Sequence, residues 1–159
     1  MSSDMSDRHS EEILQLGTFC LGEEEFGVDI LKLREIIRIM PITKVPCADG
    51  FVEGAINLRG SIIPIINMRA RFNMAAKSFD RQTRIINMEV NGLIVGFIVD
   101  SVGQVRRIPA KMVEPPPPVI ASVDSEYIIG VSNFNERLLI LLDIDKLISS
   151  ELLESLQQL

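Results

Sequence analysis

The chain has 159 residues, of which 47% are hydrophobic, and a formal net charge of -6 at pH 7. This length and composition fit one domain, or two small subdomains that share a core, and exclude a disordered chain. The acidic balance disfavours nucleic-acid binding unless one face is locally basic, and no apolar run is long enough to cross a bilayer.

Residues 1–12 are polar and acidic. They do not show the basic region followed by an apolar stretch that is typical of a secretory signal. We therefore expect a flexible tail and no secretory signal. Cys20 and Cys47 are expected to be small hydrophobic residues and not a disulfide pair, because nothing places the chain in an oxidising compartment. A cytoplasmic protein is expected, without direct membrane insertion.

Residues suited to catalysis are scarce. His9 is the only histidine and lies in the polar tail, where it is poorly placed as a general base. No CxxC, HExxH, GxxxxGK[ST] or GxGxxG motif occurs. Asp143 and Asp145 are more simply helix-start residues than metal ligands. The sequence thus predicts no enzyme, no catalytic residue, no cofactor and no metal.

The first predicted strand covers Ile13–Leu21, and a turn leads to a second strand from Glu25 to Val28. Gly17 interrupts the first strand, because the apolar residues before and after it have opposite parity. We expect a β-bulge at this glycine. Next, Asp29 can cap a short helix, whose apolar residues recur at helical spacing: Ile30, Leu33 and Ile37.

A hairpin is predicted from Phe51–Leu58 and Ile62–Asn67, joined by a turn at Arg59-Gly60. Gly60 can adopt the positive φ that this turn needs, which leaves Arg59 projecting outward. The last residue of the hairpin, an asparagine, can cap a short helical stretch.

A polar connector divides the chain near residue 80 into halves of similar strand content, 13–80 and 81–150. In the second half, Asn91-Gly92 predicts a tight turn that places three apolar pairs on one face: Val90 with Leu93, Met88 with Val95, and Ile86 with Phe97. Further strands are expected over Leu93–Val99 and Val102–Ile108.

Four consecutive prolines within Glu114–Pro118 predict a stiff, extended connector, an interpretation favoured over a PxxP ligand for another domain. A last hairpin is expected from Tyr127–Val131 and Leu138–Leu142. A C-terminal helix then starts at Asp143 or Ser150 and ends within 151–159, with an apolar stripe formed by Leu152, Leu156 and Leu159. Nine or ten short strands with few short helices predict a sandwich or barrel architecture.

Charge is uneven along the chain. From Arg59 to Arg84 six basic residues face Asp80 alone, and from Val113 onward eight acidic residues face two basic ones. Either the surface is simply solvated and unevenly charged, or a basic and an acidic face orient protein partners.

Several segments resemble, in the same order, the CheW-type chemotaxis coupling proteins. They are L-G-E-E-E-F-G-V-D-I-L-K-L-R-E-I at Leu21–Ile36, then I-T-K-V-P, F-V-E-G-A-I-N-L-R-G-S-I-I-P-I-I-N-M-R, V-G-F-I-V-D-S-V-G-Q-V, E-Y-I-I-G and L-L-I-L-L-D-I-D-K-L. Together they cover nearly all of residues 15–150. Two positions depart from the family's usual residues: Asn67 stands for an aspartate and Gly17 for an apolar residue.

This resemblance implies a mainly β fold, with two small five-strand β-barrel subdomains around a shared hydrophobic core. It implies a domain over 13–150 that acts as a non-catalytic scaffold. Its partners would be the cytoplasmic tip of methyl-accepting chemoreceptors and the regulatory domain of a CheA-type histidine kinase, which has the same fold. The protein would be cytoplasmic and recruited to membrane receptor arrays.

The resemblance also implies receptor-binding residues, and we place Arg59 first among them. The others are Glu35, Leu33, Val105, Gly54, Val102 and Gly130. Ile36 is instead expected to pack inward. Two other functions stay open: a paralogous coupler in a pilus-based or developmental pathway, and a barrel-type nucleic-acid-binding module that uses the basic stretch. The latter class stacks bases on exposed aromatic residues, and this chain has no Trp and one Tyr.

Overall fold

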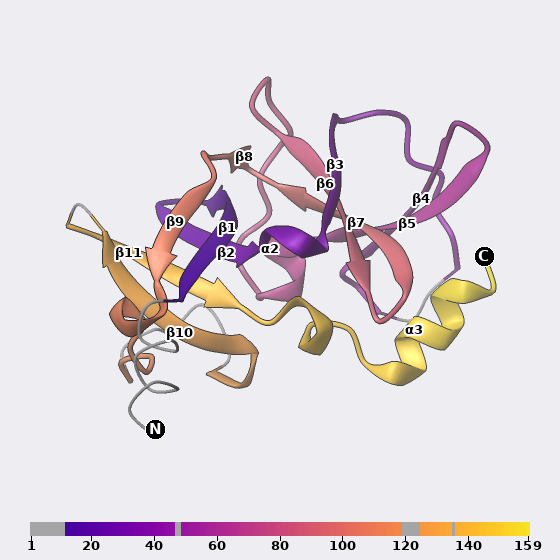
Figure 1. The fold of residues 1–159 in the computed structure, drawn as a ribbon. Helices are drawn as coiled ribbons and strands as arrows, with labels where there is room; N and C mark the ends of the chain where they lie inside the picture. The colour runs from indigo at the N-terminus through magenta and orange to yellow at the C-terminus, as the bar shows by residue number, and fades with distance from the viewer. Residues whose placement is uncertain (1–11, 47–48, 119–124, 135) are drawn as a thin grey trace.

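A computed structural model describes residues 12–46, 49–118, 125–134 and 136–159 (Figure 1). Residues 1–11 of the predicted N-terminal tail, which include His9, and Cys47 lie outside these residues. Within the described part of the chain, no helix is long and apolar enough to cross a membrane.

Strands dominate the structure and form two sheets (Figure 1). Sheet A has the order β10-β11-β2-β1, with β8 and β9 both paired to the free edge of β1. Its strands are β1 (Ile13–Leu21), β2 (Glu24–Asp29), β8 (Ser101–Val102), β9 (Arg106–Pro109), β10 (Ile128–Phe134) and β11 (Arg137–Leu142). Sheet B has the order β3-β6-β7-β5-β4. Its strands are β3 (Leu33–Arg38), β4 (Val52–Leu58), β5 (Ser61–Asn67), β6 (Arg84–Val90) and β7 (Leu93–Val99).

The helices are short and connect or follow the strands. The two α-helices are α2 (Met68–Arg71) and α3 (Ser150–Gln157). Single 3₁₀ turns are η1 (Ile30–Lys32), η2 (Ala110–Met112), η3 (Ser125–Tyr127) and η4 (Ile144–Lys146). As predicted, Asn67 caps the helix after the first hairpin, since its side chain accepts a hydrogen bond from the Ala70 N–H.

The two sheets exchange hairpins between the halves of the sequence. The β1–β2 hairpin pairs in sheet A with strands from the second half, whereas the β6–β7 hairpin pairs in sheet B with β3 and β5 of the first half. Each exchange uses a parallel pairing, of β11 with β2 and of β5 with β7. The expected division near residue 80 falls between β5 and β6, inside sheet B.

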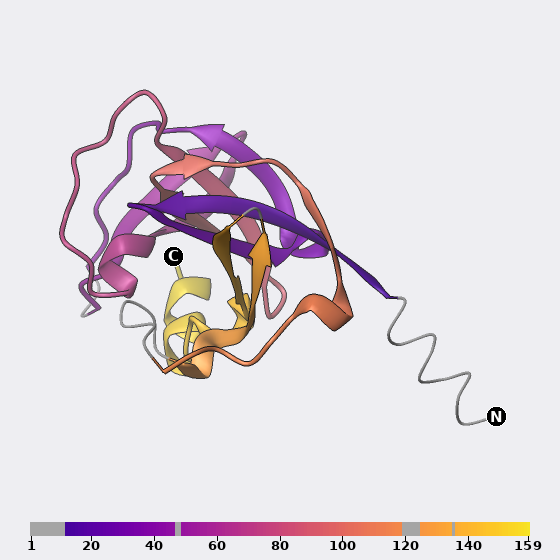
Figure 2. The same ribbon diagram turned by 90° about the vertical axis from the view of Figure 1, so that its left-hand side faces the viewer.

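Each sheet also folds back on itself. The segment after β3 pairs with β4 through Thr43 and Ala55, and the segment after β9 pairs with β10 through Glu114 and Val131. The chain that follows one outer strand therefore returns to the other outer strand, and the sheets curve strongly (Figure 2). The predicted fold, two small β subdomains with short helices and a C-terminal helix, is confirmed, although sheet A has six strands.

Three hydrophobic cores follow from this arrangement. The largest lies between the sheets and contains Phe19 and Phe26 of sheet A together with Met88 and Phe97 of sheet B, all fully buried. Sheet B encloses a second core around Ile65, and sheet A a third around Leu16, Ile108, Leu139 and Leu141. Because both sheets line the largest core, neither can bury its apolar surface without the other.

The predicted bulge at Gly17 is wrong. The pairing of β1 with β2 runs without a shift from Leu16 to Leu21. The change of parity has another cause: Leu16 faces the core of sheet A, whereas Phe19 and Leu21 face the shared core. Gly17 is needed for space, because a Cβ here would lie 2.3 Å from the Leu33 Cδ1 atom.

The predicted helix over Ile30–Ile37 is also wrong beyond its first turn. Asp29 caps η1, whose three residues are followed directly by strand β3. Pairing with β6 provides backbone hydrogen bonds along one side of β3, and Leu33 and Ile37 pack on different cores. Ile36, which we expected to pack inward, is 44% exposed.

Two smaller corrections concern the second half. The predicted strand Val102–Ile108 is interrupted, and its two parts, β8 and β9, pair separately with β1. In α3 the buried stripe is Leu152, Leu153 and Leu156, whereas Leu159 is exposed. The Asn91-Gly92 turn and all three of its predicted cross-strand pairs are confirmed.

The Gly54 position yields a stability prediction. A Cβ at Gly54 would lie 2.1 Å from the Thr43 carbonyl oxygen, at a φ of 149°. Gly54→Ala should therefore lower the free energy of unfolding by about 2 kcal/mol or more, since both the clash and the backbone strain oppose it. Gly50→Ala, where a Cβ meets no atom within 4 Å, should change it by less than about 0.5 kcal/mol. Urea unfolding of the two variants measures the difference, and equal midpoints would contradict this account.

Candidate functional site

Arg59 and Glu35, both singled out from the sequence, form an ion pair. Glu35 lies on β3, one outer strand of sheet B, and Arg59 lies at the tip of the hairpin that contains the other outer strand, β4. The Arg59 Nη1 donates to Glu35 Oε2 at 3.2 Å, and Nη2 donates to Oε1. The guanidinium thus binds the carboxylate with both of its outer nitrogens and links the two edges of the sheet.

The pair is open to solvent, with side-chain exposures of 68% for Arg59 and 37% for Glu35. The hydrogen bond from Arg59 lowers the pKa of Glu35, and the same bond raises the pKa of Arg59. Both groups are therefore charged at neutral pH. Only two of the five guanidinium N–H groups are needed for this contact, so Arg59 keeps donors for a further acceptor.

The turn that carries Arg59 is strained at that residue. Arg59 has a φ of 51° and Gly60 a φ of 87°, the same combination as Asn91 and Gly92 in the β6–β7 turn. The positive φ expected at Gly60 is confirmed, and Arg59 also adopts one. A bulky residue with positive φ is uncommon, and such strain often accompanies a functional position.

The other five predicted residues make no polar contact with this pair. Leu33 and Val102 are partly buried and pack against the shared core. Val105 is 55% exposed, between β8 and β9. Gly54 and Gly130 are buried and occupy equivalent places, since a Cβ on either would approach the carbonyl oxygen of the segment that closes its sheet: Thr43 for Gly54 and Glu114 for Gly130. Close packing against the backbone therefore explains why a glycine occupies each position.

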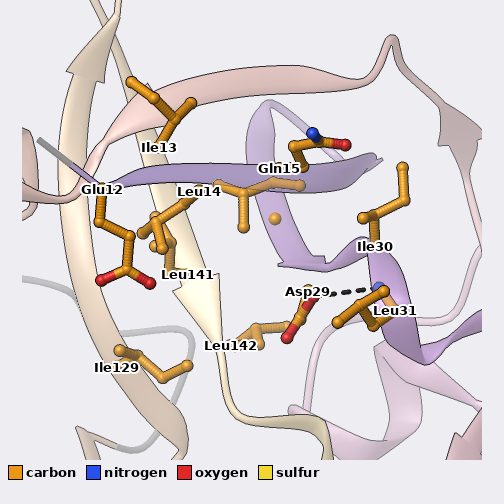
Figure 3. A pocket seen from close by; sticks show the side chains of 12 residues that line it. Glu12, Ile13, Leu14, Gln15, Asp29, Ile30, Leu31, Ile129, Leu141 and Leu142 are labelled. Atoms are coloured by element: carbon orange, nitrogen blue, oxygen red, sulfur yellow. Dashed lines mark hydrogen bonds between the residues drawn. The ribbon is translucent and has the colours of Figure 1, made fainter.

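An apolar groove of about 450 Å³ lies on sheet A, beside η1. Figure 3 shows side chains of β1, η1, β10 and β11 arranged around it. Three aliphatic side chains at the groove are exposed: Ile13 by 51%, Leu31 by 76% and Ile129 by 61%. Our sequence reasoning missed this surface, because its residues come from segments far apart in the chain.

A largely buried ion pair ties the two sheets together. Arg69 of α2 donates to Asp100, at the end of β7, from Nε at 2.8 Å and from Nη2 at 2.6 Å. The N–H of Gly22, in the β1–β2 turn, donates to the same carboxylate at 2.7 Å. Asp100 thereby joins the turn of sheet A to α2 and β7 of sheet B.

A second carboxylate, that of Asp145, binds the turn of the β6–β7 hairpin. Asp145 of η4 accepts hydrogen bonds from Lys32 Nζ at 2.8 Å and from the N–H of Asn91, in the β6–β7 turn, at 3.2 Å. Asp145 comes two residues after the cap of η4, as Arg69 comes two residues after the cap of α2. The two halves therefore hold their exchanged hairpins in related ways, with the charges reversed.

These features define the class of a β-sheet docking module: two sheets fixed by a common core, with an exposed ion pair and an apolar groove. Among the described residues no cluster of His, Cys, Asp and Glu could hold a metal ion. Residues 15–152 match the model of the CheW-like domain, so the chain belongs to the CheW-like family.

Similar proteins agree with this assignment. The chain is 40% identical over 133 residues to the chemotaxis protein CheW of Klebsiella aerogenes, covering 84% of this chain and 80% of that protein. It is 39% identical over 156 residues to the chemotaxis protein CheW of Treponema pallidum, covering 94% and 91%. The crystal structure of the scaffolding protein TtCheW from Thermoanaerobacter tengcongensis superimposes with a TM-score of 0.79 at 35% identity, covering 87% of this chain and 89% of that one.

The function predicted from the sequence is confirmed at the level of the family. The chain is a non-catalytic scaffold of the CheW-like family in chemotaxis signal transduction.

The hydrogen bonds that Asp100 accepts from Arg69 and Gly22 predict that stability depends on pH. Burial by itself raises the pKa of Asp100, but hydrogen bonds from Arg69 and Gly22, with the charges of Arg69 and Lys77, outweigh burial and lower that pKa below its ordinary value. A carboxylate with a lowered folded-state pKa stabilises fully above its unfolded pKa of about 3.9, and this contribution is lost as the pH falls through the folded-state pKa. Asp100→Asn should cost on the order of 2–4 kcal/mol at pH 7 and flatten the loss of stability below about pH 4.

Chemical unfolding at several pH values measures both effects. Glu154→Gln, at an exposed position of α3, is the control and should leave the profile unchanged. An Asp100→Asn profile parallel to wild type would contradict the assignment.

Proposed function

We propose that this scaffold binds the cytoplasmic tip of a chemoreceptor at the edge of sheet B that carries Arg59 and Glu35. The single observation that carries the proposal is the exposed, strained arginine held in place by a carboxylate. A fixed guanidinium loses little conformational freedom when it binds, and its remaining donors suit a carboxylate or a backbone carbonyl on a helical tip. Leu33, Val102, Val105, Gly54 and Gly130 remain proposed members of this receptor surface, the two glycines through the backbone that they allow.

The regulatory domain of a CheA-type kinase is the second proposed partner, and we assign it to the apolar groove on sheet A. Three exposed aliphatic side chains around one concave surface leave apolar area that a protein interface can bury. Separate receptor and kinase surfaces on different sheets would let one chain hold both partners, at a geometry fixed by the shared core.

The proposed setting is the cytoplasmic side of receptor arrays in a chemotaxis pathway. The matched relatives are named chemotaxis proteins, which favours this pathway over the pilus-based or developmental alternative. The nucleic-acid-binding alternative gains no support from the family.

Arg59 gives the test of the receptor surface. Arg59→Ala should weaken binding of a receptor tip fragment by about ten- to a hundredfold, as for a hot-spot arginine. Arg59→Lys should restore only part of the affinity, because an ammonium cannot make the forked contact. Calorimetric titration against wild type and both variants measures this. Arg107→Ala, which removes an exposed arginine of β9, is the control; equal affinities for all four proteins would retire the receptor proposal.

The kinase surface is tested by placing charge in the groove. Leu31→Asp and Ile13→Asp should each weaken binding of the kinase regulatory domain by at least about tenfold, because a carboxylate would be buried without a partner. Ile62→Asp is the matched control, since Ile62 is as exposed as Ile13, at 51%, but lies on sheet B. A loss of affinity with Ile62→Asp alone would move the kinase surface to sheet B.

A further inference from the structure

Two arginines stand directly opposite each other at one end of sheet B. Arg38 of β3 and Arg84 of β6 are cross-strand partners, so their side chains leave the sheet on the same face. Like charges directly opposite each other destabilise a sheet, and most other residues at the end of an outer strand would cost less stability. Arg81 comes three residues before Arg84 and is exposed.

No described carboxylate forms an ion pair with Arg38, Arg81 or Arg84. The Arg84 Nη1 donates instead to the backbone carbonyls of Arg81 and Thr83, each at 2.8 Å. Asp80, the acidic residue next to this group in sequence, is already bound by Lys77 at 3.2 Å and by the N–H of Gln82 at 2.8 Å.

Arg34, on the same strand, shows the contrast. It forms an ion pair with Glu89 of β6. Strand β6 thus supplies a carboxylate for Arg34 but places Arg84 opposite Arg38. Arg38 and Arg84 can therefore donate hydrogen bonds to carboxylates of another molecule.

We propose that Arg38, Arg84 and Arg81 form a docking site for an acidic segment of a protein partner. Ile36 favours a protein over a nucleic acid, because it lies two residues from Arg38 on the same face, is 44% exposed, and offers apolar area that a peptide side chain can cover. The overall charge of -6 also opposes a long polyanion, whereas a short acidic segment needs only the local basic group. The site shares strand β3 with the proposed receptor surface, but Ile36 and Arg38 point to the opposite face of the strand from Glu35. The proposal does not depend on the receptor or kinase surfaces.

The test is a titration of the isotopically labelled full chain with a hexaglutamate peptide at low ionic strength, followed by amide NMR shifts. Shifts should concentrate at 36–38 and 81–84, and the double substitution Arg38→Gln with Arg84→Gln should weaken binding at least about tenfold. Arg34→Gln is the matched control and should change binding less than about twofold. Shifts elsewhere, or equal binding by the double variant, would overturn the proposal. So would tighter binding of a hexathymidylate oligonucleotide at the same residues, which would identify a nucleic-acid site.

Stability supplies an independent readout. Arg38→Gln removes a like-charge contact and should raise the urea midpoint at low salt, whereas Arg34→Gln breaks an ion pair and should lower it. A lower midpoint for both would show that Arg38 serves the fold, and would overturn the docking site.

Discussion

The hydrophobic core enclosed between sheets A and B is the constraint on which the rest of the structure depends. Each half of the chain gives one hairpin to the other half's sheet, so the shared core cannot form until both halves are in place. Within this core the stacked rings of Phe19, Phe26 and Phe72, with centroids 5.4 and 5.7 Å apart, join β1 and β2 of sheet A to the C-terminal end of α2. After β11 the chain crosses toward sheet B (Figure 1), where the buried leucines of α3 complete the same core.

Polar contacts fix the relative orientation of the two sheets, which the hydrophobic core alone does not determine. Dispersion and burial are not directional, so they hold the sheets together without setting a precise angle between them. Asp100 and Asp145 each bind the turn of an exchanged hairpin and a cation from a neighbouring element. Such a rigid frame suits a scaffold, whose function is to hold partners at fixed positions. The exposed ion pair, the apolar groove and the basic group of Arg38, Arg81 and Arg84 all lie on the outside of this frame.

The candidate site was partly predictable. The Arg59-Gly60 turn is a local pattern, and the sequence placed Arg59 at its tip correctly. Its contact with Glu35 was not predictable, because it depends on the curvature that brings β3 close to the β4–β5 hairpin. The groove was missed for a similar reason: Ile13, Leu31 and Ile129 are unremarkable apolar residues until β1, η1 and β10 meet.

Local chemistry let the sequence alone determine the turns, the caps and most strands, since Asn91-Gly92, Arg59-Gly60 and Asn67 act within a few residues of themselves. The sequence also determined the family, through the ordered segments from residue 15 to 150. Tertiary structure decided the segment after Asp29, where helical spacing lost to pairing with β6, because backbone hydrogen bonds and two separate cores outweigh a weak local preference. It likewise decided the parity of β1: a strand with a different core on each face shows a broken alternation that sequence reasoning takes for a bulge.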